Sequence, residues 1–247
     1  MNRIFISDVH LGAFDEHTNI LIENELIELI DFCEENQIHP TILGDLFDFW
    51  MEYSGEIPEL GESILKRCRD YNHSIKQILY ITGNHDNWTS GYFSDLGFDV
   101  ESEFRILNLN GIKILLLHGD GLSDQSFGLK RPFLHRLLRH PNFVKLYQSV
   151  FPPKSGLRAM KLFSDVSKLN SQFDTERLTK WAEKFLNEND YDFILSGHDH
   201  CHRKETFSGG CYINTGPFFK SRSVIFYTNN CFQLVSWNAN SRELIPF

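Results

Sequence analysis

Five short blocks of polar residues in this sequence have the residue types and spacing of a metal-binding site. The blocks are Asp8-Val9-His10, Gly44-Asp45 with Asp48, Gly83-Asn84-His85-Asp86, His118-Gly119-Asp120 and Gly197-His198-Asp199-His200. Their side chains offer carboxylate, amide and imidazole donors but no thiolate. This mixture suits Mn²⁺, Zn²⁺, Fe²⁺ or Mg²⁺ and disfavours Cu(I) or an iron–sulfur cluster. The blocks therefore indicate a site for divalent metal ions.

The spacing inside two of the blocks supports this interpretation. In Asp8-x-His10, the alternation of an extended segment points both side chains to one side, so the pair can bind one ion. The same holds for His198-x-His200. Taken alone, an Asp-x-His pair is weak evidence, and Asp45 could equally belong to a helix cap. Five blocks in this order favour a shared site over five separate accidents.

A short apolar run precedes each block and is typical of a buried strand. These runs span residues 4–7, 41–43, 78–82, 112–117 and 193–196. In layered α/β folds, the loops beyond the carboxyl ends of such strands converge on one site. A fold of this class would therefore bring the five blocks together.

Other segments predict the elements that surround this site. Residues 20–33, 62–71 and 175–186 have apolar side chains at near-helical spacing, Leu21 among them, which predicts three amphipathic helices. Three β-rich segments near the C-terminus are separated by turn signals, and we expect antiparallel strands there. They span residues 211–214, 223–227 and 231–235.

Charge is distributed unevenly along the 247 residues. The chain carries −9 overall, but residues 121–170 hold nine basic and two acidic side chains, which is +7, so the remainder is −16. The prolines of this window are Pro132, Pro141, Pro152 and Pro153. Because proline interrupts helices, these positions predict boundaries within a basic helical insertion at about 122–170. The negative total argues against a general binder of nucleic acid.

Three features bear on location and redox chemistry. The N-terminal residues enter a β-like run at once, without the leader of a signal peptide, so we expect a cytoplasmic protein. No run approaches the ~18 apolar residues that span a bilayer, so membrane contact would be peripheral. The five cysteines lack CxxC spacing and predict neither a disulfide framework nor a thiolate zinc site.

Taken in order, the five blocks resemble the motifs of the calcineurin-like metallophosphoesterases, D-x-H, G-D-x-x-D, G-N-H-D/E, H and G-H-x-H. The resemblance implies an α/β fold, a four-layer α/β/β/α sandwich, in a single domain over residues 1–247 with the helical insertion as a lid. It also implies two metal ions. One would be bound by Asp8, His10, Asp45 and His200, and the other by Asp45, Asn84, His118 and His198.

Such a centre would hydrolyse phosphate esters or pyrophosphates. Two cations about 3.5–4 Å apart can hold a hydroxide that attacks phosphorus directly, so we expect no covalent phosphoenzyme. The resemblance gives His85 no ligand role. We expect His85 to donate to a phosphoryl oxygen or to protonate the leaving group, with Asp48 orienting its imidazole.

Three features narrow the substrate class, namely residues 44–50, residues 118–122 and the basic insertion that follows them. Together they resemble the UDP-2,3-diacylglucosamine pyrophosphatases of lipid A synthesis. This resemblance implies cleavage of a pyrophosphate to UMP and a lipid monophosphate, with Mn²⁺ as the metal. It also implies peripheral contact with the cytoplasmic face of the inner membrane. The best-known members carry Arg at the position of His85, so this chain departs from their pattern there.

The insertion would supply the contacts to the lipid. Its phenylalanines either line an acyl cleft or pack the insertion against the domain, and they are Phe127, Phe133, Phe143, Phe151 and Phe163. Further substrate contacts are expected, by resemblance, from Asp124, Ser167, Lys168 and Asn170.

Two other functions are compatible with these motifs. One is a soluble phosphodiesterase or nucleotide pyrophosphatase, whose insertion would cap a small substrate. The other is a binding protein that has kept the fold without activity, and the presence of every expected ligand argues against it. The sequence predicts no particular oligomeric state.

Overall fold

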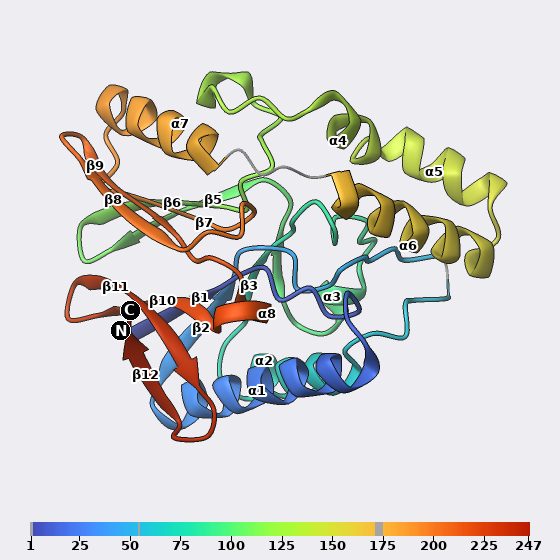
Figure 1. Cartoon of the computed structure of the whole chain (residues 1–247), viewed down its shortest axis with the longest axis horizontal. Coiled ribbons are helices and arrows are strands. Elements are labelled where there is room, and N and C mark those ends of the chain that lie inside the picture. The colour runs from blue at the N-terminus through green and yellow to red at the C-terminus, as the bar shows by residue number, and fades with distance from the viewer. Residues whose placement is uncertain (1, 54, 171–174) are drawn as a thin grey trace.

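Two β-sheets face each other at the centre of the chain (Figure 1). The computed structural model describes residues 2–53, 55–170 and 175–247, and the side chains of all of these except residues 163–170. The larger sheet has the strand order β12-β11-β10-β1-β2-β3-β4, and the smaller has the order β5-β6-β7-β9-β8.

The strands of the larger sheet are β1 (Asn2–Ile6), β2 (Ile38–Ile42), β3 (Leu79–Ile81), β4 (Asp99–Glu101), β10 (Ser223–Thr228), β11 (Cys231–Asn238) and β12 (Glu243–Pro246). Those of the smaller sheet are β5 (Phe104–Leu109), β6 (Ile112–Leu117), β7 (Phe193–Ser196), β8 (Arg203–Phe207) and β9 (Gly210–Asn214). Strands β1 to β4 run parallel, as do β6, β7 and β9. The carboxyl ends of two parallel groups therefore supply the loops of the site.

Apolar side chains from both sheets fill the space between them. Phe5 and Ile225 of the larger sheet pack in one cluster with Ile114 and Leu195 of the smaller, and all four are fully buried. Burying one such side chain stabilises the fold by about 1.5–3 kcal/mol. This shared core holds the two sheets, and with them the two sets of loops, in a fixed relation.

Helices cover the outer faces and complete the expected four-layer α/β/β/α sandwich (Figure 1). Helices α1 (Glu16–Glu35) and α2 (Glu62–Ser74) pack on the larger sheet, and α7 (Thr175–Glu188) packs on the smaller one. Two short helices are α3 (Tyr92–Asp95), between β3 and β4 of the larger sheet, and α8 (Phe218–Ser221), in the connection from β9 of the smaller sheet to β10 of the larger. All three predicted amphipathic helices are confirmed. One detail was wrong, because Leu21 lies outside the buried stripe of α1 and is 47% exposed.

The strand predictions were confirmed at all five blocks, while the C-terminal strands need a correction. Strands β10 and β11 are antiparallel as expected. Strand β9 instead belongs to the smaller sheet, where it pairs parallel with β7 and antiparallel with β8. The sequence analysis missed β8 because its residues are mostly polar and exposed, as suits a strand at the edge of a sheet.

The window at 122–170 contains the short 3-10 helix η1 (Gln125–Phe127) and the helices α4 (Phe133–Leu138), α5 (Pro141–Val150) and α6 (Pro153–Asn170). Figure 1 shows α4, α5 and α6 as a group beside the sandwich. Each begins at or directly after a proline, as the sequence predicts. Among the described residues, no helix has both the length and the apolar composition of a membrane span.

The described phenylalanines of the window divide between two environments. Phe127 stacks on Phe185 of α7, and Phe143 packs edge-on against Trp88, so both pack the window against the sandwich. Phe133 is 71% exposed and Phe151 is 39% exposed. The side chain of Phe163 lies outside the described residues.

Candidate metal centre

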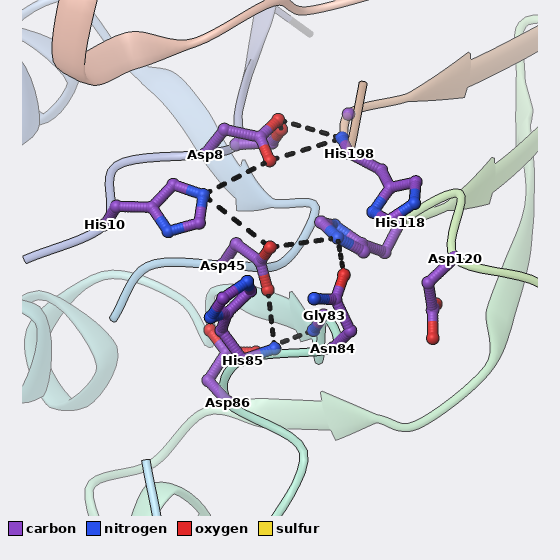
Figure 2. Close-up of polar contacts among 12 residues, drawn as sticks. Asp8, His10, Asp45, Gly83, Asn84, His85, Asp86, His118, Asp120 and His198 are labelled. Atoms are coloured by element: carbon purple, nitrogen blue, oxygen red, sulfur yellow. Dashed lines mark hydrogen bonds and ion pairs between the residues drawn. The ribbon is translucent and has the colours of Figure 1, made fainter. Parts of the chain in front are cut away.

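The loops after five strands bring all the expected ligand residues together. Asp8 and His10 follow β1, Asp45 follows β2, Asn84 follows β3, His118 follows β6, and His198 and His200 follow β7. Figure 2 shows Asp45 between His10 and His118. In that view Asp8 and His198 lie above Asp45, and Asn84 and His85 lie below it. The ligand atoms form two groups that share Asp45.

The first group surrounds Nε2 of His10. This atom lies 3.0 Å from Nε2 of His200, 3.7 Å from Oδ2 of Asp45 and 3.8 Å from Oδ1 of Asp8. His200 Nε2 also lies 3.5 Å from Asp8 Oδ1. Two imidazoles and two carboxylates, three of these side chains almost fully buried, therefore face one point.

The second group surrounds Nε2 of His118. It lies 3.2 Å from Oδ2 of Asp45 and 3.1 Å from Oδ1 of Asn84, and a nitrogen of His198 completes the cluster. Asp45 Oδ2 therefore faces both groups. Its other oxygen, Oδ1, accepts a hydrogen bond from the backbone N–H of His85 at 3.0 Å, which fixes the orientation of the carboxylate.

These distances and donors fit divalent metal ions. Atoms that share an ion at about 2.0–2.2 Å lie about 3.0–3.6 Å apart, close to the separations in both groups. The backbone carbonyl of Leu43 accepts a hydrogen bond from His118 Nδ1 at 2.8 Å. This bond fixes the tautomer whose Nε2 lone pair points into the site, as is usual for a metal-binding histidine.

The backbone at the site is unusual and explains how the side chains converge. The non-glycine residues Asp8, His10, Asp45 and His200 have φ of 51–53°, and His198 has φ of 79°. Left-handed conformations of this kind are uncommon outside glycine and cluster at functional sites. The expectation that Asp8-x-His10 and His198-x-His200 are extended segments was therefore wrong. In both pairs the side chains converge because the loop turns sharply at both residues.

Two glycines leave room for these side chains. A Cβ atom on Gly83 would lie 2.0 Å from Oδ1 of Asp45. Gly44 has φ of +91°, and a Cβ atom there would lie 2.5 Å from Nδ1 of His118. A larger residue at either position would displace a ligand side chain.

The buried charges shift the pKa values of the ligands. Burial alone would lower the pKa of His10, but the adjacent carboxylates outweigh it and raise the pKa to about 9. The same balance, chiefly through Asp45, raises the pKa of His118 to about 10. Burial and the charge of His118 lower the pKa of His198 to about 3. Against the effect of burial, the imidazoles hold the pKa of Asp8 below its usual range. A cation entering the site would displace the extra protons of His10 and His118.

His85 lies beside the first group, with its ring edge-on to His10 at 4.9 Å between centroids. Its Nδ1 donates to the backbone carbonyl oxygen of Asp48 at 2.6 Å. The main chain of Asp48 therefore contacts the ring of His85, and Oδ1 of its carboxylate lies 3.4 Å from Nδ1 of His10. A carboxylate oxygen of Asp48 and ring nitrogens of His10 and His85 lie within 4.8 Å of one another. Burial, partly opposed by Asp45, lowers the pKa of His85.

Asp86 and Asp120 are among the buried acids of the blocks to which the sequence analysis gave no role. Asp86 accepts hydrogen bonds from the backbone N–H groups of Leu46 and Gly83 and from the hydroxyl of Tyr80, at 2.8, 2.6 and 2.5 Å. Burial raises the pKa of Asp86 to about 6. Asp120 is 2% exposed and lies beside two arginines. Both residues belong to blocks that the sequence analysis had identified, and this was the signal that could have pointed to a role for them.

Of the expected substrate contacts of the insertion, only Asp124 has a described side chain. Asp124 is exposed, and its Oδ1 accepts a hydrogen bond from the backbone N–H of Ser126 at 2.8 Å, so it caps η1. The side chains of Ser167, Lys168 and Asn170 in α6 lie outside the described residues.

A pocket lies between the metal centre and the insertion. Its polar lining residues are Asp48, Asn84, His85, Asn87, His135 and Arg139. Its apolar lining residues are Phe49, Trp50, Met51, Trp88, Leu138 and Met160, and they alternate with the polar ones along the same segments. The empty space, counted together with the open solvent at its mouth, is about 630 Å³. A ligand here could place an anionic group at the centre and an apolar group against the insertion.

The sandwich and the donor set define a metal-dependent phosphoesterase. The chain belongs to the calcineurin-like phosphoesterase family, because the sequence model of that family matches residues 1–202. Membership implies divalent metal ions, and the described residues hold three candidate groups for them, Asp8 with His10 and His200, His10 with Asp48 and His85, and Asp45 with His118 and His198.

Similar proteins include several named UDP-2,3-diacylglucosamine hydrolase. One from Porphyromonas gingivalis is 26% identical over 219 residues, which are 79% of this chain and 82% of that protein. One from Neisseria meningitidis is 29% identical over 172 residues, 68% of each chain. One from Aliivibrio fischeri is 24% identical over 255 residues, covering 95% of this chain and 98% of that protein.

A solved structure described as Yfce, a phosphoesterase from E. coli, matches 99% of this chain and 97% of its own, with a TM-score of 0.52 and 16% sequence identity. At this identity the likeness concerns the fold alone. It agrees with the four-layer sandwich that the motifs predict.

Proposed function

We propose that this phosphoesterase cleaves the pyrophosphate of UDP-2,3-diacylglucosamine, or of a close lipid-linked nucleotide sugar, to UMP and a lipid monophosphate. The observation that carries the proposal is the pocket, which is lined both by Asn84 and His85 at the metal centre and by the apolar side chains Leu138 and Met160 of the insertion. A substrate that joins a pyrophosphate to acyl chains requires both kinds of lining. The names of the relatives support the same substrate class.

Two ions, with Mn²⁺ as the leading candidate, would occupy the two groups. Asp8, His10, Asp45 and His200 would bind the first, and Asp45, Asn84, His118 and His198 the second. Two such cations, when bound, lower the pKa of water and stabilise charge on the oxygens around phosphorus. The chain's part is to hold the donors in place through the Leu43 carbonyl and the His85 N–H.

His85 is the proposed proton donor or phosphoryl contact. Because its Nδ1 donates to the carbonyl of Asp48, we propose Nε2 as the atom that meets a phosphoryl or leaving-group oxygen, to which it donates when the imidazole is protonated. General acid catalysis of this kind contributes about 10²–10⁴-fold to the rate. Asp48 positions the imidazole through its main chain, and its carboxylate supports His10.

The insertion would act as the lid over the acyl chains. Met51 and Trp88 of the sandwich pack in one cluster with Leu138 of α4 and Met160 of α6, directly beside the metal centre. Acyl chains placed against this cluster would gain roughly 25 cal/mol for each Å² removed from water.

The outer surface of the insertion suits an anionic membrane at the cytoplasmic face. Exposed apolar side chains gather on α4 to α6, namely Phe133, Leu134, Leu137, Leu146, Val150, Phe151 and Leu162. Basic side chains stand among them, namely Lys145, Lys154, Arg158 and Lys161. A surface that combines apolar and cationic side chains fits the interface of a membrane that presents anionic lipids.

The substrate assay compares two ligands with the same pyrophosphate. Purified protein with Mn²⁺ should release UMP from UDP-2,3-diacylglucosamine and act far more slowly on the same sugar nucleotide without acyl chains. Equal kcat/KM for both would refute the acyl part of the proposal and favour a phosphodiesterase or nucleotide pyrophosphatase that acts on small substrates.

A further inference from the structure

Arg139 follows helix α4 of the insertion, and its side chain is only 9% exposed. A guanidinium group carries a permanent charge and five N–H donors, so its burial requires acceptors on several sides. The acceptors that surround Arg139 come from three separate loops of the sandwich.

Each nitrogen of the guanidinium contacts a different part of the site. Nε donates to Oδ2 of Asp120 at 3.1 Å, and Nη1 donates to the carbonyl oxygen of Ser102 at 3.0 Å. Nη2 donates to the carbonyl oxygens of Gly83 and Thr82 at 2.7 and 3.3 Å. One side chain of the insertion therefore joins the loops after β3 and β4 of the larger sheet to the loop after β6 of the smaller sheet.

Two of these contacts adjoin the metal centre. Gly83 directly precedes Asn84, and Asp120 stands two residues after His118. Asn84 Oδ1 and His118 Nε2 are 3.1 Å apart, although they belong to loops of different sheets. Arg139 contacts both of these loops, through the residue next to Asn84 and through Asp120.

Two further observations separate this contact between loops from substrate binding and from general stability. The nitrogens of Arg139 donate four hydrogen bonds to the sandwich loops, so four of the five N–H groups are used there, although the side chain also borders the pocket. Arg131 also contacts Asp120, with its Nε at 3.2 Å from Oδ2. Removal of Arg139 therefore leaves the buried carboxylate with a cation, and the fold should survive.

We propose that Arg139 is a positioning residue that holds Asn84 and His118 in register and thereby creates the second metal subsite. This inference rests on the proposed metal centre. It makes the insertion a structural part of that centre, in addition to a cover for the substrate. Partners that orient metal ligands typically contribute 10–100-fold to metal affinity.

The test measures Mn²⁺ binding by electron paramagnetic resonance and calorimetry in the wild type, Arg139→Ala and Arg139→Lys. We expect the wild type to bind two ions and Arg139→Ala to lose affinity about 10–100-fold for one ion only. Arg139→Lys should fall between them, because an ammonium group cannot reach acceptors in three loops at once. Guanidinium ion added at low millimolar concentration should restore part of the lost affinity in Arg139→Ala.

Arg67→Ala is the matched control. Arg67 is also partly buried and joins two elements, donating from α2 to Asp31 and Glu34 of α1, but it lies outside the metal loops. It should lower thermal stability without changing either Mn²⁺ affinity. The inference is overturned if Arg139→Ala binds two ions with wild-type affinities, or if Arg67→Ala weakens one ion equally. A wild type that binds fewer than two ions would instead refute the proposed metal centre.

Discussion

Substitution of Gly83 by alanine should damage the metal centre without removing any ligand. The new Cβ atom would lie 2.0 Å from Oδ1 of Asp45 and 2.7 Å from its backbone nitrogen, whereas real Cβ contacts are essentially never under 3.0 Å. The carboxylate must therefore move by about 1 Å. Asp45 faces both groups of ligands, so this one displacement affects both ions.

The size of the effect follows from that displacement. A misplacement of about 1 Å at a catalytic centre costs about 10²-fold in rate. Overpacking of a buried site costs about 1–3 kcal/mol of folding free energy. We therefore expect Gly83→Ala to fold, to lose about 10²-fold in kcat for UMP release and to bind Mn²⁺ more weakly. Steady-state kinetics, Mn²⁺ titration and urea unfolding measure the three quantities.

Gly111→Ala provides the control for backbone strain. Gly111 has φ of +88°, and a Cβ atom there would meet nothing within 4 Å. It should reduce stability by about 1–3 kcal/mol and leave kcat and Mn²⁺ affinity unchanged. Wild-type kcat and Mn²⁺ binding in Gly83→Ala would refute the reasoning, because the carboxylate could then shift without consequence.

Four other substitutions test separate parts of the account. His85→Ala should lower kcat by about 10²–10⁴-fold with both Mn²⁺ ions retained, and loss of an ion in a binding assay would mean that His85 is a ligand. Mn²⁺ at 100 times its Kd should stabilise the wild type against urea by about 2.7 kcal/mol per site. The Asp45→Asn variant should show no such stabilisation. An undiminished stabilisation of that variant would exclude Asp45 as a shared ligand. Burial and the charge of Arg3 lower the pKa of His39 to about 4 from an ordinary 6.5. Between pH 6.5 and pH 4, the imidazole is therefore protonated in the unfolded chain but not in the folded one, and the free energy of unfolding falls as the pH drops. The free energy of unfolding should therefore fall less between pH 7 and pH 5 in His39→Gln than in the wild type. An equal fall in both proteins, measured by urea unfolding, would contradict the lowered pKa of His39. Leu146→Glu, at a side chain 62% exposed, should weaken binding to anionic vesicles about tenfold without changing kcat on detergent-dispersed substrate, and unchanged vesicle binding would count against the membrane surface.

The position of the candidate metal centre could be predicted because each proposed ligand lies shortly after its strand in the sequence. Each ligand follows a β-branched or aliphatic run, and the run and the ligand are both visible in one short segment, as in residues 112–118. The prolines of the insertion were equally informative, since α4, α5 and α6 begin where those residues forbid a continuous helix.

The remaining features depend on contacts between distant segments. Strand β9 runs parallel to its partner β7, from which it is separated in the sequence by the polar edge strand β8. The turn residues around β9 give no indication that β7 is its partner. Arg139 could not be recognised because its acceptors are mostly backbone carbonyls, which every residue possesses. The left-handed backbone at Asp8 and His10 was hidden for a related reason, since the surrounding loops impose it against local preference.

The central claim is that a centre built around Asp45 hydrolyses a lipid-linked pyrophosphate. The most direct measurement is mass spectrometry of the products formed from UDP-2,3-diacylglucosamine by the purified protein, with Mn²⁺ and after removal of metal by a chelator. The account predicts UMP and the lipid monophosphate in equal amounts with Mn²⁺, and neither product with the chelator or with Asp45→Asn. Turnover of simple phosphodiesters without any UMP from the lipid would contradict it.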